Sequence, residues 1–142
     1  MAGRARHGEQ LASVPLFSAL SKKDLGVVAR SVDEVDVEAG RTLVTEDRTG
    51  HEFFLILDGE AVVHRNNRKV ALLGPGQWFG EMALLDRGPR TATVVAATDM
   101  RLLVLAQREF AGLLDSMPGF AAKILNGVAH RLRESDVQSV TH

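Results

Sequence analysis

The sequence predicts a mainly β fold with helices at both ends, and three observations support this prediction. Short runs rich in β-branched and aromatic residues follow one another between residues 33 and 106, separated by Gly, Pro, Asn and Asp. Before and after this region the apolar residues have helical spacing. Strands do not alternate with helices, so we expect an antiparallel sandwich or jelly roll and not a doubly wound α/β fold.

The chain length of 142 residues suits one compact domain covering residues 1–142. The composition, with 45% hydrophobic and 25% charged residues, is typical of a soluble globular protein. A net charge of −1 gives no electrostatic basis for general nucleic-acid binding. We find neither a membrane-spanning apolar run nor a signal peptide. The absence of cysteine excludes disulfides and thiolate-bound metals, and we expect a cytoplasmic location without membrane attachment.

Residues 8–32 are predicted to be helical. The first helix is expected to break at Pro15, because proline lacks the N–H that a helix interior uses. Ser21 has the character of an N-cap, with Asp24 at the third helical position. An amphipathic helix is predicted after this cap from the spacing of Leu25, Val28 and Ala29.

The central region, residues 33–106, is predicted to form a β-barrel. The expected strands lie at 34–37, 42–45, 52–57, 61–64, 69–72, 77–79, 91–96 and 101–105. Turn residues separate them, among which Asp58-Gly59 predicts a tight hairpin and Asn66-Asn67 marks another turn.

Two helices are predicted in the C-terminal region, residues 107–138. The first ends at the break formed by Met117, Pro118 and Gly119, and the second continues to about residue 138. The second helix has an apolar stripe that needs a partner, formed by Ile124, Val128 and Leu132. Two alternatives remain open: the stripe packs on the chain's own barrel, or it pairs with a second copy in a homodimer.

Residues 79–94 contain the most informative motif, Phe-Gly-Glu-Met-Ala-Leu-Leu-Asp-Arg-Gly-Pro-Arg-Thr-Ala-Thr-Val. The Glu81 carboxylate can accept hydrogen bonds from vicinal hydroxyls, and the Arg90 guanidinium can hold a phosphate in a bidentate fork. Gly80 and the small Ala83 allow backbone N–H groups to approach an anion. A hydroxyl acceptor beside a phosphate clamp indicates a ribose phosphate.

This segment resembles the phosphate-binding cassette of the cyclic nucleotide-binding domain family, the family of catabolite activator protein and the protein kinase A regulatory subunit. The family pattern runs Phe-Gly-Glu, an apolar residue, Ala-Leu, a short variable turn, then Pro-Arg, a small residue and Ala-Thr-Val. The sequence fits it through Val94 without a gap. The resemblance implies an antiparallel β jelly-roll barrel (a double-stranded β-helix) with N-terminal helices and two C-terminal helices. It also implies that Glu81 accepts the ribose 2′-hydroxyl and that Arg90 pairs with the cyclic phosphate.

The resemblance implies further ligand contacts. The turn would be lined by Gly80, Met82, Ala83 and Leu84, the wall under the base by Val63, Leu73 and Val94, and the adenine would be reached by Ser135 and Asp136. Thr91 adds a hydroxyl that could bond the guanine of cGMP, but family members with this residue also bind cAMP, so Thr91 does not decide between the two nucleotides. The sequence of the last helix resembles that of the bacterial cAMP-receptor branch of the family, so we expect cAMP to be favoured over cGMP.

The expected function is that of a regulatory sensor that signals through its C-terminal helices. Its regulatory ligand is cAMP or cGMP, and no cofactor or metal is expected. We expect no enzyme activity, because no catalytic grouping stands out. No helix-turn-helix lies within these 142 residues, so direct DNA binding by this chain is not expected. The termini look natural, although the sequence leaves open whether the chain is a stand-alone domain or a fragment, and which protein lies downstream. The alternative is a nucleotide-independent interaction module that retains the fold.

Overall fold

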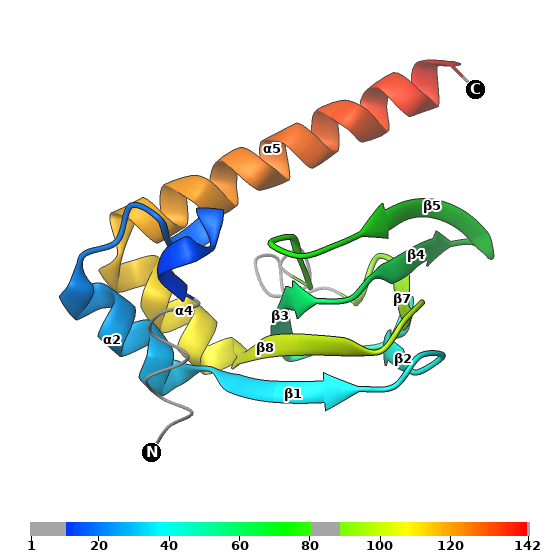
Figure 1. Cartoon of the computed structure of the whole chain (residues 1–142). Coiled ribbons are helices and arrows are strands. Elements are labelled where there is room, and N and C mark those ends of the chain that lie inside the picture. The colour runs from blue at the N-terminus through cyan, green and yellow to red at the C-terminus, as the bar shows by residue number, and fades with distance from the viewer. Residues whose placement is uncertain (1–10, 81–88, 142) are drawn as a thin grey trace. The chain divides into compact units, whose positions relative to one another are not determined.

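The computed structural model describes residues 11–80 and 89–141 (Figure 1). Side chains are described as far as Arg133. The chain separates into two compact units. A helical unit combines Met1–Arg30 with Ala111–His142, and a β unit comprises Ser31–Phe110. These limits lie close to the predicted changes from helix to strand and back. The prediction that both units make one domain stays a prediction.

The β unit contains two four-stranded antiparallel sheets. The first sheet has the order β1 (Asp33–Val37), β8 (Met100–Ala106), β3 (Glu52–Asp58) and β6 (Trp78–Phe79). The second has the order β2 (Thr42–Val44), β7 (Thr93–Ala96), β4 (Ala61–Arg65) and β5 (Arg68–Leu73) (Figure 1). The predicted mainly β, antiparallel jelly-roll fold with flanking helices is confirmed, with strand boundaries that differ by one or two residues.

Buried side chains of both sheets form one apolar core of the β unit, comprising Val37, Phe54, Ile56, Ala61, Leu73, Phe79, Val94, Ala96, Met100, Leu102 and Val104. Successive residues of a strand point to opposite faces, so Phe54 belongs to this core and Phe53 to the other face of its sheet. Phe54 stacks on Phe79 with ring centroids 4.8 Å apart, and Phe53 stacks on Phe110 at the same separation. β3 is therefore buried on both faces, which explains its unbroken apolar run.

The predicted tight hairpin at Asp58-Gly59 is wrong, because β3 and β4 belong to different sheets. The chain crosses between the sheets here, and the N–H of Ala97 donates to the carbonyl oxygen of Glu60 at 2.9 Å. Gly59 has a φ of 91° and packs so closely that a Cβ would lie 2.3 Å from the carbonyl oxygen of Asp99. The glycine serves a close backbone crossing, where the sequence pattern indicated a hairpin.

The tight hairpin of this region is the connection between β4 and β5. Its two central residues, Asn66 and Asn67, have φ angles of 54° and 63°. Two consecutive left-handed residues are the requirement of a type I′ turn, and asparagine tolerates this conformation better than most residues.

The helical unit confirms the predicted cap at Ser21, whose Oγ accepts the N–H of Asp24 at 3.1 Å. Its described elements are the 3₁₀ helix η1 (Pro15–Phe17), most of α2 (Lys22–Ser31), the second part of α4 (Gln107–Ser116) and α5 (Pro118–Thr141). The predicted break between the last two helices is also confirmed, and Pro118 begins α5, where its missing N–H costs no hydrogen bond.

In this unit η1 packs on α5. The Phe17 and Phe120 rings stack with centroids 5.9 Å apart, and Lys123 Nζ donates to the carbonyl oxygen of Pro15 at 2.7 Å. Along the described ranges, no helix has both the length and the apolar character needed to cross a membrane.

Candidate functional site

Arg90 is the centre of the candidate site. The residue is only 5% exposed, and within residues 11–80 and 89–133 it is the only polar or charged residue that is buried. Nη1 donates to the carbonyl oxygen of Gly80 at 2.9 Å, and Nη2 donates to that of Glu52 at 2.7 Å. Hydrogen bonds from a charged donor contribute about 1.5–3 kcal/mol each. The end of β6 and the start of β3 therefore orient the guanidinium.

The backbone of Arg90 is held by the connection between β2 and β3. The Arg90 N–H donates to the carbonyl oxygen of Arg48 at 2.8 Å, and its carbonyl oxygen accepts the N–H of Asp47 at 2.9 Å. Nearby, Thr93 Oγ1 accepts the N–H of Glu46 at 2.9 Å. Both the main chain and the side chain of Arg90 are thus attached to the segment that leads into β3.

Two glycines give the guanidinium its space. A Cβ on Gly50 would lie 1.7 Å from Arg90 Nε, and one on Gly80 would lie 2.7 Å from Arg90 Nη1. Sequence reasoning identified Gly80 as a site residue, but it missed both Gly50 and the Glu52 carbonyl. A backbone carbonyl has no signature in a sequence, and Glu52 is 38 positions from Arg90, so no sequence signal could have found this contact.

The other predicted site residues fall into three groups: residues in or against the core, an exposed residue, and residues whose side chains the structure does not describe. The inter-sheet core contains Leu73 and Val94, with Val63 packed against it, and Val63 pairs with Val94 across the β4–β7 ladder. Thr91 is exposed, and its carbonyl oxygen accepts Nε of Arg65 at 3.2 Å. Outside the described residues lie Glu81, Met82, Ala83 and Leu84; the side chains of Ser135 and Asp136 are not described either.

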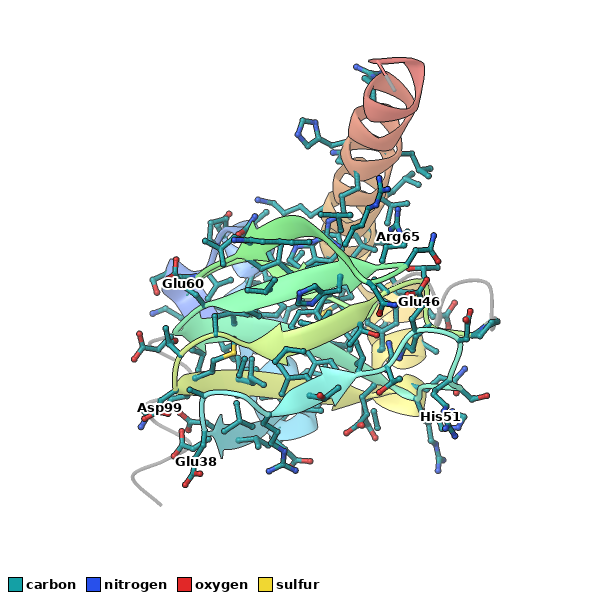
Figure 2. The ribbon with its side chains drawn as sticks, turned by 90° about the vertical axis from the view of Figure 1, so that its right-hand side faces the viewer. Glu38, Glu46, His51, Glu60, Arg65 and Asp99 are labelled. Atoms are coloured by element: carbon teal, nitrogen blue, oxygen red, sulfur yellow. The ribbon has the colours of Figure 1, made fainter. Side chains whose placement is uncertain are left out.

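The hairpin between β4 and β5 is tied to the same end of the β unit. Glu46 Oε1 accepts the N–H of Asn66 at 3.0 Å, in addition to the bond between Arg65 and Thr91. Figure 2 shows Arg65 and Glu46 together at one end of the unit, with Glu60, Asp99 and Glu38 at the other. This hairpin is therefore anchored to both chain segments next to Arg90. In the described part of the chain, no group of three or more residues could hold a metal ion.

The start of β3 is also bonded to the start of α4. The N–H of Gln107 donates to the carbonyl oxygen of His51 at 2.7 Å, and His51 Nδ1 lies 3.2 Å from Gln107 Oε1. The next carbonyl along the chain is that of Glu52, which accepts from Arg90. Two consecutive carbonyls therefore connect the guanidinium with the first residue of α4.

Comparison with known proteins gives a consistent result. Residues 34–117 match the family described as the cyclic nucleotide-binding domain. The chain is 32% identical over 129 residues to the cyclic AMP receptor protein of Thermus thermophilus, covering 87% of this chain and 60% of that relative. It is 34% identical over 125 residues to a cAMP-dependent protein kinase regulatory subunit of Mycosarcoma maydis, covering 82% and 24%. The chain thus spans less than two thirds of either relative.

A solved structure agrees with these relatives. The crystal structure of the Thermus thermophilus catabolite activator protein matches with a TM-score of 0.79 and 32% identity, covering 87% of this chain and 61% of that one. The range matched by the family includes Arg90, both carbonyls that accept from it, and the start of α4. This chain therefore belongs to the cyclic nucleotide-binding domain family.

Proposed function

We propose that this chain is a regulatory sensor domain that binds a cyclic nucleotide through residues 79–94. In this proposal Arg90 contacts the cyclic phosphate and Glu81 the ribose 2′-hydroxyl. The burial of the Arg90 guanidinium, oriented by two backbone carbonyls, is the observation that carries the proposal. A charge in a low-dielectric setting interacts more strongly with an anion than an exposed charge does. The planar fork also matches two phosphate oxygens.

The remaining contacts follow the same logic. In this proposal Gly80, Met82, Ala83 and Leu84 line the turn before Arg90, and their backbone N–H groups face the phosphate or the ribose. The base lies toward the edge of the apolar core formed by Val63 and Leu73, and Ser135 on α5 reaches the adenine. We favour cAMP over cGMP because both relatives described above are named for cAMP, whereas the Thr91 hydroxyl permits either nucleotide.

We propose that the C-terminal helices transmit the effect of nucleotide binding. The bonds from Arg90 to Glu52 and from His51 to Gln107 form a short connection between the phosphate contact and the start of α4. A ligand shifts a conformational equilibrium only if it binds the two states with different affinity. A phosphate that binds the guanidinium would compete with its hydrogen bond to the Glu52 carbonyl oxygen. The bonds at the start of β3 would therefore differ between the nucleotide-bound and the nucleotide-free conformation.

We further propose that α5 pairs with a second copy of the chain. Leu125 and Leu132 lie seven positions apart on one face of this helix and are 68% and 52% exposed. Of the predicted stripe, Ile124 is buried and Leu132 is exposed, so the surface proposed for pairing consists of Leu125 and Leu132. The proposed sensor role involves no catalysis and no direct DNA contact by this chain.

Isothermal titration calorimetry with cAMP and with cGMP, at equal concentration and ionic strength, tests the proposed function. We expect micromolar or tighter binding of cAMP and weaker binding of cGMP. Arg90→Ala should weaken binding by tens to thousands of fold, and each factor of ten corresponds to about 1.4 kcal/mol of binding free energy. Glu81→Ala should weaken it less, because a hydroxyl loses an acceptor but no counter-charge is removed.

Arg101→Ala is the matched control, since this arginine is exposed on β8 and bonds to Asp36 at 3.1 Å. It should leave nucleotide affinity unchanged. If folded, ligand-free protein gives neither heat nor a thermal shift with either nucleotide, the nucleotide-independent interaction module becomes the better explanation.

A further inference from the structure

Gly50 packs against Nε, Cζ and Nη2 of the Arg90 guanidinium. A Cβ built on this glycine would be 1.7 Å from Nε, 2.2 Å from Cζ and 2.4 Å from Nη2. Real Cβ atoms essentially never approach another heavy atom closer than 3.0 Å. A side chain at position 50 and the observed position of the guanidinium therefore exclude each other.

The requirement at Gly50 is one of size and not of backbone conformation. Its φ lies outside the left-handed range, so alanine could adopt the same backbone without strain. Gly80, on the other side of the guanidinium, differs because its φ is 95° and any side chain there strains the backbone. At position 50 the group that would have to move is the end of the flexible Arg90 side chain.

We propose that Gly50 is a positioning residue for anion binding, acting through Arg90. This inference rests on the proposed function, in which Arg90 is the phosphate contact. The bare backbone at Gly50 lets the guanidinium take the position from which Nη1 and Nη2 donate to the carbonyl oxygens of Gly80 and Glu52. A methyl group there displaces the fork, and hydrogen bonds weaken steeply once distance and angle depart from their optimum.

A double-mutant cycle on cAMP affinity tests the proposal, using Gly50→Ala, Arg90→Ala and the double variant. We expect Gly50→Ala alone to weaken binding by about tenfold or more, toward the level of Arg90→Ala. In the Arg90→Ala background it should change affinity by less than about twofold, because the group it displaces is absent. An equal loss in both backgrounds, or no loss in either, would overturn the proposal.

Gly74→Ala is the matched control. Gly74 belongs to the same β unit, its φ lies outside the left-handed range, and a Cβ there would have no heavy atom within 4 Å. It should leave affinity unchanged. If Gly74→Ala weakens binding as much as Gly50→Ala, the effect is a general one of adding a methyl group, and Gly50 has no positioning role.

A spectrum of the ligand-free protein separates this inference from the proposed function. The Nε–H signal of Arg90 in a ¹⁵N-labelled sample is identified by its loss in Arg90→Ala. We expect this signal to move and to exchange faster with water in Gly50→Ala, but not in Gly74→Ala. If the wild-type chain binds no cyclic nucleotide, the proposed function fails while this spectrum still decides the matter. An unchanged Arg90 signal in Gly50→Ala refutes the positioning role.

Discussion

Replacing Arg90 with alanine is expected to destabilise the ligand-free β unit. If Arg90 served only to contact a ligand, its loss would leave the stability of the empty protein nearly unchanged. The structure indicates otherwise, because the guanidinium is buried and donates to the carbonyl oxygens of Gly80 and Glu52. These bonds join the end of β6 to the start of β3 and to the residue that leads into β7.

The size of the effect follows from these two bonds. Hydrogen bonds from a charged donor contribute about 1.5–3 kcal/mol each, and Arg90→Ala removes two part-buried bonds of this kind. Removing a buried charge offsets part of this loss, since a charge is expensive to desolvate. We therefore expect the free energy of unfolding to fall by about 2–4 kcal/mol, a large share of the 5–15 kcal/mol that is typical of a domain.

Urea denaturation followed by tryptophan fluorescence measures this change. Trp78 is the only tryptophan of the chain, and it lies in β6 with its ring 5.8 Å from Phe53, so its emission reports unfolding of the β unit. Arg101→Ala serves as control, because the Arg101 side chain is 44% exposed and an ion pair at the surface adds little to stability. Equal urea midpoints for the two variants would refute the reasoning.

Two further predictions concern backbone packing and assembly. Gly40→Ala should lower the free energy of unfolding by about 1 kcal/mol, the cost of a side chain in a left-handed conformation. Gly59→Ala should lower it by clearly more. Both glycines have a φ of 91°, but only at Gly59 would a Cβ meet the Asp99 carbonyl oxygen. Equal urea midpoints would show that the close approach carries no cost. Leu132→Glu should reduce self-association in sedimentation equilibrium, whereas Asn126→Glu, also exposed on α5, should not; a monomeric wild-type chain would rule out the proposed pairing.

Local patterns were sufficient for the secondary structure and for the family. The strands are short apolar runs between turn residues, and the Ser21 cap depends on residues three positions apart, so the information lies close together in the chain. The motif at 79–94 is equally local, and it indicated the family to which the comparisons also assign the chain. What Glu81 and the turn after it contact lies outside the described residues and stays a prediction.

Long-range geometry decided the rest. Asp58-Gly59 reads as a hairpin because a turn has the same composition whether it joins paired strands or two different sheets. The environment of Arg90 was equally hidden, because it is built from the space left by Gly50 and from backbone carbonyls that every residue possesses. The sequence by itself determined that the cassette contains an arginine at position 90. Only the tertiary structure, by bringing the start of β3 against that arginine, decided how its guanidinium is held.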